Sequence, residues 1–311
     1  MGKGRTFAVK LFRGLVTVWL VVTLTFAALH LSGDPIEVLV GDQAPPEVVA
    51  HYRAKFGLDR PLWQQYLAYF ASIAQGDFGL SMSDRTPAAT LILQALPKTV
   101  LLGLTAFAGG MALGVVLGIV AAINRDRPID RMVMSFATFG FSIPNFFLGI
   151  VLILVFALYL RVLPSAGSDS PAHLLLPAFT LGTHLAGTFA RFTRSAMLDV
   201  LNRPYMVAAE ARGVPRLARI FLHALPNAAI PIVTIAGLKL GDLVAGSVVV
   251  ETVFAWPGVG RLLVNAVASR DFAVVQTILV MVAVSMTIAN LVVDAIYTLI
   301  DPRIRTGQGK G

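Results

Sequence analysis

The 311-residue sequence contains no cysteine and few charged residues. The absence of cysteine excludes disulfides, thiolate catalysis and zinc sites built on thiolates. Charged side chains make up 14% and hydrophobic ones 56% of the chain, and the mean hydropathy is +0.76. A typical soluble domain carries about 25% charged residues. The composition therefore excludes an ordinary water-soluble protein of this size.

Sequence motifs for nucleotide hydrolysis and for a metal centre are also missing. No Gly-x-x-x-x-Gly-Lys-Ser/Thr loop occurs, since the glycines of residues 307–311 lack both the spacing and the hydroxyl residue. The five histidines are scattered and form no His-Glu-x-x-His pair. We therefore expect no catalytic residue, no metal site and no cofactor in this chain, and no hydrolysis of ATP by it.

The chain does have a series of apolar runs, each long enough to cross a bilayer as a helix of about 20 residues. Lys239 and Asp242 interrupt one run, and the others are uncharged. The runs cover residues 14–31, 99–123, 132–160, 171–190, 227–250 and 272–293. The first has the basic flank of a signal peptide, but no small-x-small cleavage site follows it. The sequence predicts an all-α membrane protein with about six transmembrane helices.

The charges between these runs predict their orientation. Lys and Arg residues, with no acidic one, precede the first run, and arginines dominate the second and fourth connections. Residues 32–96 instead carry seven acidic residues against four basic ones. By the positive-inside rule, both termini then face the cytoplasm and residues 32–96 lie outside. Basic residues that punctuate apolar segments do not form the patch of a nucleic-acid binder, so we expect no nucleic-acid partner.

This topology divides the chain into four parts. They are a cytoplasmic tail (1–13), the first span (14–31), an external loop or cap (32–96) and a membrane core (97–311) that contains a basic cytoplasmic segment (195–226). The cap shows short helical patterns over residues 46–56 and 61–74. In the core, glycines 110, 114 and 118 share one helix face, where another backbone can approach closely.

Polar residues within the spans are candidates for a translocation pathway. Lys239 and Asp242 are three residues apart on one helix, and charge at that depth is costly unless paired or hydrated. A hydrated pathway and a structural ion pair are both open interpretations. Asn145, which follows the helix-bending Pro144, is a further candidate, with interhelical hydrogen bonding as the alternative.

The cytoplasmic segment contains a short helical pattern, residues 205–213, that ends at a glycine. Its small alanines permit close docking of a second protein, and Gly213 can adopt the left-handed conformation that stops a helix. Its arginines suit an interfacial helix on anionic membrane lipid equally well. The residues alone leave both interpretations open.

The same segment resembles the cytoplasmic EAA loop of ABC importer permeases, a Glu-Ala-Ala-x3-Gly pattern followed after nine residues by Ile-x-Leu-Pro. With Gly213 as anchor, Ala208 and Ala209 are the paired alanines, and Leu225 and Pro226 fall at the final positions. The sequence departs from the pattern at two positions: Val207 stands at the glutamate and His223 at the isoleucine. Glu210 is displaced by three residues from the motif's glutamate.

Further strings narrow the resemblance to the first permease of the dipeptide, oligopeptide and nickel branch. They are Gly-Asp-Pro at 33–35, Gly-Leu-Asp-Arg-Pro at 57–61, Gly-Asp-Phe-Gly at 76–79, Ser-Ile-Pro-Asn-Phe at 142–146, Glu-Thr-Val-Phe at 251–254, Trp-Pro-Gly at 256–258 and Asp-Pro-Arg-Ile-Arg at 301–305. The resemblance implies a type I ABC importer permease in a bacterial inner membrane.

The resemblance also implies the partners and the site. The partners are a second related permease, two ATP-binding subunits that hold ATP and Mg, and an external solute-binding protein. The implied contacts with the ATPase are Tyr205, Ala208, Ala209, Glu210, Gly213, Leu225 and Pro226, with residues 205–213 as a coupling helix. The expected cargo is a peptide or similar small solute, which no motif specifies further. A stand-alone secondary transporter is the alternative function.

Overall fold

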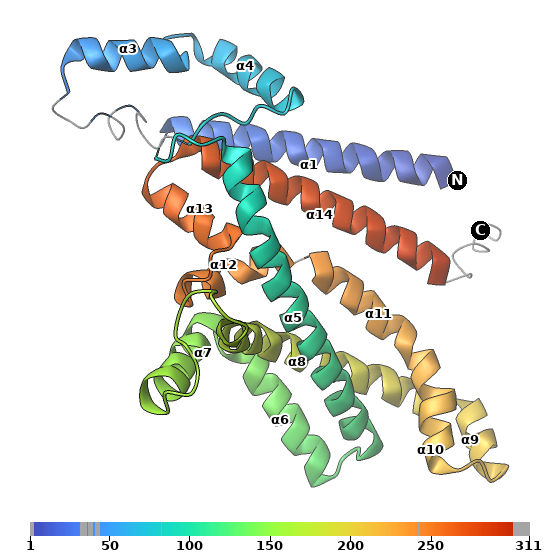
Figure 1. Ribbon diagram of the computed structural model, residues 1–311. Coiled ribbons are helices and arrows are strands. Elements are labelled where there is room, and N and C mark those ends of the chain that lie inside the picture. The colour runs from blue at the N-terminus through green and yellow to red at the C-terminus, as the bar shows by residue number, and fades with distance from the viewer. Residues whose placement is uncertain are drawn as a thin grey trace. The chain divides into compact units, whose positions relative to one another are not determined.

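The computed structural model describes residues 3–31, 36, 40, 44–81, 83–241 and 243–300. These residues are mostly helical, and the part described contains no β-strand beyond one isolated bridge between Leu80 and Pro87 (Figure 1). The chain divides into two compact units. Unit 1 comprises residues 1–98 and 257–287, and unit 2 comprises residues 99–256 and 288–311.

Unit 1 combines the N-terminal helix, the predicted cap and part of the C-terminal region. Its helices are α1 (Lys3–Leu31), α3 (Pro46–Phe56), α4 (Leu62–Ala74), the start of α5 (Ala88–Ile123), α13 (Val259–Ala268) and most of α14 (Phe272–Ile300). Its core joins Ile92 of α5 to Val259 of α13 and Ile278 of α14. In the cap, α3 and α4 agree with the short helices expected at 46–56 and 61–74.

Two polar contacts fix the loops of unit 1. The hydroxyls of Thr23 in α1 and Tyr66 in α4 are hydrogen-bonded at 2.7 Å, and the Phe26 ring packs on Tyr66. Ser81 Oγ donates to Asp271 Oδ2 at 2.5 Å, and both residues are buried. Asp271 Oδ1 also accepts from the backbone N–H of Val274, which caps the first turn of α14. The buried carboxylate thus ties the segment before α5 to the start of α14.

Unit 2 contains the rest of α5 and the helices from α6 to α12. They are α6 (Pro128–Ser142), α7 (Asn145–Leu152), the π-helix η1 (Ile153–Tyr159), α8 (Ala172–Leu201), α9 (Pro204–Ala211), α10 (Arg216–Ala218), the π-helix η2 (Arg219–Ala224), α11 (Leu225–Gly241) and α12 (Leu243–Val253). The central helix is α8, which packs against α6, α7, α11 and α12. Figure 1 shows α9 and α10 together at one end of this unit.

The three glycines predicted to permit close packing do so. A Cβ on Gly110 would lie 2.6 Å from the carbonyl oxygen of Gly182, and one on Gly118 would lie 2.6 Å from that of Ala190. Between them, a Cβ on Gly114 would lie 2.5 Å from the Ala186 oxygen. The two helices α5 and α8 therefore meet backbone to backbone, as small-residue interfaces in membranes allow.

One of the predicted spans is not a straight helix. Residues 132–160 form α6 and the run from α7 through η1, which meet at an angle of 100°. Ile143 is extended (φ −72°, ψ 128°) because the residue before a proline disfavours the helical region. Residues 227–250 are covered by α11 and α12, and Asp242, the residue between these two helices, lies outside the described residues.

Length and composition identify a subset of the described helices as able to cross a membrane unaided. These are α5 and the continuous run from Arg216 to Leu240, with the bent pair as a third if it counts as one span. Shorter apolar helices cover Phe12–Ala28 and Phe272–Ile288. The prediction of six spans comes from the apolar runs of the whole sequence, whereas these helices are identified within the described residues.

Candidate functional site

The candidate site is the helical segment that follows α8, and its first helix has well-defined ends. Arg203 is extended (φ −75°, ψ 146°), and Pro204 begins α9 at the position where its missing N–H costs nothing. At the other end the N–H of Gly213 donates to the Glu210 oxygen at 2.9 Å, and that of Val214 donates to the Ala209 oxygen at 3.1 Å. With Gly213 at φ +77°, these bonds form a Schellman motif.

The two faces of α9 have different roles. Met206 and Ala209 are each 4% exposed, and Met206 packs with Met197 of α8 and Ile220 of η2. Tyr205 is 43% exposed, Val207 is 62% exposed, and Ala208 is also at the surface. The structure therefore separates the two paired alanines. Ala208 is available to a partner, whereas Ala209 is buried within the chain.

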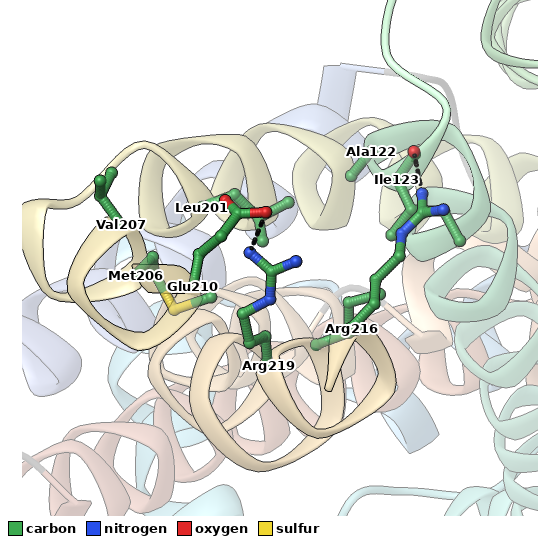
Figure 2. A pocket seen from close by; sticks show the side chains of 9 residues that line it. Ala122, Ile123, Leu201, Met206, Val207, Glu210, Arg216 and Arg219 are labelled. Atoms are coloured by element: carbon green, nitrogen blue, oxygen red, sulfur yellow. Dashed lines mark hydrogen bonds and ion pairs between the residues drawn. The ribbon is translucent and has the colours of Figure 1, made fainter. Parts of the chain in front are cut away.

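Charged contacts connect α9 and the start of α10 to the elements beside them (Figure 2). Glu210 Oε1 lies 2.7 Å from Arg219 Nη1, which joins α9 to η2. Arg216 Nη2 donates to the carbonyl oxygen of Ile123 at 3.0 Å, which joins the start of α10 to the end of α5. The Glu210 side chain is 66% exposed, so the pair contributes about 1 kcal/mol or less.

A hollow of about 220 Å³ lies between these elements (Figure 2). Its wall is apolar except for three charged side chains, those of Glu210, Arg216 and Arg219. The apolar lining comes from Ala122, Ile123, Leu201, Met206, Val207 and Ile220. The hollow leaves one side of α9 without packing on its own chain.

The predicted end of the segment, Leu225 and Pro226, lies at the start of α11. Leu225 packs against the cluster that contains Met206 and Ile220, and Pro226 is exposed. The Asn227 side chain donates to the His223 carbonyl at 2.7 Å. The motif's last residues therefore lie within the continuous helical run from Arg216 to Leu240.

The predicted pathway residues are on other elements of unit 2. Asn145 is the first residue of α7, directly after the break at Pro144, and it is partly exposed. Lys239 is in the last turn of α11 and is also partly exposed. Asp242 lies outside the described residues, so the expected pairing of Lys239 with Asp242 stays a prediction.

Several polar contacts of unit 2 could not be found from sequence because their partners are far apart in the chain. Arg194 Nε and Nη2 donate to the two oxygens of Asp130, each at 2.7 Å, and Asp130 is buried. Glu251 is fully buried and accepts from the distant Thr99 at 2.8 Å, as well as from Ser247, one turn earlier in α12, at 2.9 Å. In the sequence, only the apolar run before Glu251 signals that its carboxylate needs a partner, and no such signal surrounds Asp130.

Comparison with known proteins decides the family. Residues 114–306 match the family described as "Binding-protein-dependent transport system inner membrane component", and residues 5–103 match the N-terminal region described for such membrane components. The chain belongs to this family. It is therefore a permease subunit of a binding-protein-dependent ABC importer and not an enzyme.

Relatives of this permease cover nearly its whole length. It is 42% identical over 301 residues to the glutathione transport system permease protein GsiC of Escherichia coli K12. The aligned region covers 96% of this chain and 98% of that relative. The GsiC protein of Shigella flexneri serotype 5b matches equally well, at 42% identity over the same shares.

Solved structures support the fold of the permease. The MetNI methionine ABC transporter in an inward-facing conformation matches with a TM-score of 0.59 at 20% identity, over 68% of this chain and 97% of that one. An amino acid ABC transporter matches with a TM-score of 0.56 at 16% identity, over 68% and 95%. The all-α, type I importer permease fold expected from the sequence is confirmed.

Membership of this family indicates the location and the partners of the permease. It is an inner-membrane component that works with ATPase and binding-protein partners.

Proposed function

We propose that this permease forms half of a translocation path together with a second, related permease. Two ATP-binding subunits dock on the cytoplasmic side and hold the ATP and Mg, and a solute-binding protein docks outside over the cap of residues 32–96. Both termini are cytoplasmic, as the distribution of basic residues favours. No group of His, Cys, Asp and Glu suited to a metal ion occurs in the part of the chain that the structure describes.

The cargo is a small peptide or a peptide-like solute such as glutathione. The identity of 42% to GsiC over nearly the full length supports this class of cargo. The sequence of the membrane core names no side chain that would distinguish glutathione from a dipeptide, an oligopeptide, an opine, a sugar or a nickel chelate.

Coupling to ATP hydrolysis occurs through α9. One observation carries this assignment: α9 presents Tyr205, Val207 and Ala208 outward, while Met206 packs with residues of α8 and η2 and Ala209 is buried. A short helix held in this way moves as one body with its neighbours. Because η2 continues directly into α11, a push on α9 reaches a membrane helix without an intervening flexible loop.

The rest of the segment strengthens this lever. Gly213 stops the helix sharply, Glu210 links it to Arg219, and Leu225 and Pro226 lie where the segment enters α11. Closure of the ATP-bound subunits would move the segment and switch the path between its two sides, which is alternating access. The alternative of a stand-alone secondary transporter has no support from the comparisons.

Two measurements test the proposal. A tagged permease is purified from native membranes, and the proteins that come with it are identified; we expect an ATP-binding subunit and a second permease. The complex is then reconstituted in liposomes with the binding protein and radiolabelled glutathione outside, and with ATP or ADP inside. We expect uptake only with ATP.

Uptake by the purified chain alone, without ATP, would contradict the proposal and favour a secondary transporter. ATP-dependent uptake of another peptide, with none of glutathione, would contradict only the cargo.

A further inference from the structure

A second polar cluster of unit 2 lies away from the coupling segment, around the ring of Phe141. His184 stacks on this ring with 4.7 Å between centroids and 25° between planes. The guanidinium carbon of Arg191 lies 4.3 Å from the same ring centroid. His184 and Arg191 are two turns apart on one face of α8, so a single aromatic side chain of α6 spans both.

Two positively charged side chains of unit 2 act on this cluster. The positive charges of Arg191 and of Lys239 in α11 both act on the His184 ring. The ion pairs between described residues include Arg125 with Asp126, Arg194 with Asp130 and Arg219 with Glu210, and none of these involves Arg191. The Nε atom of Arg191 is buried and has no hydrogen-bond partner there.

Burying the Arg191 Nε donor without a partner costs free energy unless another group binds it. A buried, unpaired donor costs about 1–3 kcal/mol. His184 lies within the predicted span 171–190, where ionisable side chains face the bundle interior or a water-filled cavity. One turn further along α8, Arg194 has a carboxylate partner in Asp130. Arg191 therefore has a donor that an anion from outside the chain could bind.

The cluster also lies beside a broken helix. Phe141 is in the last turn of α6, and a Cβ on its neighbour Gly140 would approach Thr183 Cγ2 to 3.0 Å. Immediately after the break, Asn145 begins α7 without a side-chain cap. Free N–H groups at the start of a helix favour negative charge, and transporters use such half-helices near their substrates.

We propose that Phe141, His184 and Arg191 form a cationic station on the translocation path, which holds a carboxylate of an anionic solute during its passage. The station extends the expected pathway residues Asn145 and Lys239, and it rests on the proposed importer function. Asp242 lies outside the described residues, and the proposal depends on Phe141, His184 and Arg191 alone.

The absence of cysteine permits a test that needs no knowledge of the cargo. His184→Cys is introduced into the assembled transporter, with the cysteines of the other subunits removed. The cysteine is then labelled with two methanethiosulfonate reagents of similar size, one bearing a sulfonate and one a trimethylammonium group. The ratio of the two rates, divided by the ratio for free cysteine, reports the local potential.

We expect the sulfonate reagent to react faster than the trimethylammonium reagent, relative to free cysteine. Arg191→Gln should lower this rate ratio on the order of fivefold, because one unit charge within about 9 Å acts on the two reagents in opposite directions. Arg191→Lys should retain the advantage. Arg131→Gln is the matched control: it removes one exposed arginine from the same unit and should leave the ratio unchanged.

Two outcomes would overturn the inference: a ratio that Arg191→Gln does not change, or a cysteine that neither reagent reaches. The first would mean that Arg191 contributes no field there, and the second that no aqueous path passes the cluster. The labelling does not require transport, so a complex that fails in the uptake assay would refute the proposed function while this ratio is still measured.

Discussion

Replacing Gly114 by alanine tests the close packing of α5 on α8, on which the shape of unit 2 depends. The added Cβ would lie 2.5 Å from the Ala186 carbonyl oxygen and 2.6 Å from the Phe189 Cβ. Neither atom can rotate away, because one belongs to the backbone and the other is bonded directly to it. Relief requires the helices to separate by roughly 1 Å, since heavy atoms prefer about 3.5 Å or more.

Overpacking of this kind costs about 1–3 kcal/mol. For a protein of this size, the change corresponds to a fall in melting temperature of roughly 2–10 °C. The assay is thermal unfolding of the purified permease in detergent, followed by circular dichroism.

The matched control is Gly109, which is in the same helix. A Cβ on Gly109 would meet nothing within 4 Å. Alanine there should be neutral or should stabilise by about 0.5–1 kcal/mol, because glycine is a poor helix former. If Gly114→Ala melted at the same temperature as Gly109→Ala, or higher, the reasoning about this interface would be wrong.

Three further predictions concern single positions. Gly213→Val should lower substrate-stimulated ATPase activity severalfold with normal membrane insertion. Gly213→Asn should lose less of this activity, because asparagine tolerates φ +77°. If both variants had wild-type ATPase activity, a coupling role for Gly213 would be contradicted. Glu210→Gln should lower the free energy of unfolding by about 1 kcal/mol or less, because the Glu210 side chain is 66% exposed, and a double-mutant cycle with Arg219→Gln should give a coupling energy no larger than this. A coupling energy of several kcal/mol would contradict the interpretation of the contact as an exposed ion pair. Ala255→Gly should raise the melting temperature, because Ala255 has φ +49° at the end of α12, where a left-handed alanine costs about 1 kcal/mol; a lower melting temperature would refute this strain.

The sequence alone predicted those features that depend on neighbours in the chain. Gly213 was expected to stop a helix because of its conformational freedom, and it does so. The glycines at 110, 114 and 118 were expected on one face because their spacing is close to a helical turn. The helices over 46–56 and 61–74 were bounded by prolines and glycines, which act locally.

Features set by distant parts of the chain were missed. Pro144 signalled a bend, but the angle of 100° depends on how α7 packs against α8 and α12. The pattern of paired alanines does not say that Ala208 faces outward and Ala209 inward, because the orientation of α9 is set by Met206 and its contacts with α8 and η2.

The contacts of Phe141 illustrate the same limit for a site. His184 and Arg191 follow it by 43 and 50 positions in the sequence, and nothing local links an aromatic residue at the end of α6 to either. Their convergence requires the crossing of α6 over α8, which only the fold supplies.

The most direct test of the central claim is photo-cross-linking from α9 in native membranes. Ala208→Cys and Ala209→Cys are made separately, and each is labelled with benzophenone maleimide before illumination. Coupling through the exposed face of α9 predicts an adduct between position 208 and the ATP-binding subunit, with little or none from the buried position 209. Adducts from position 208 only to lipid, or to the external binding protein, would contradict the account.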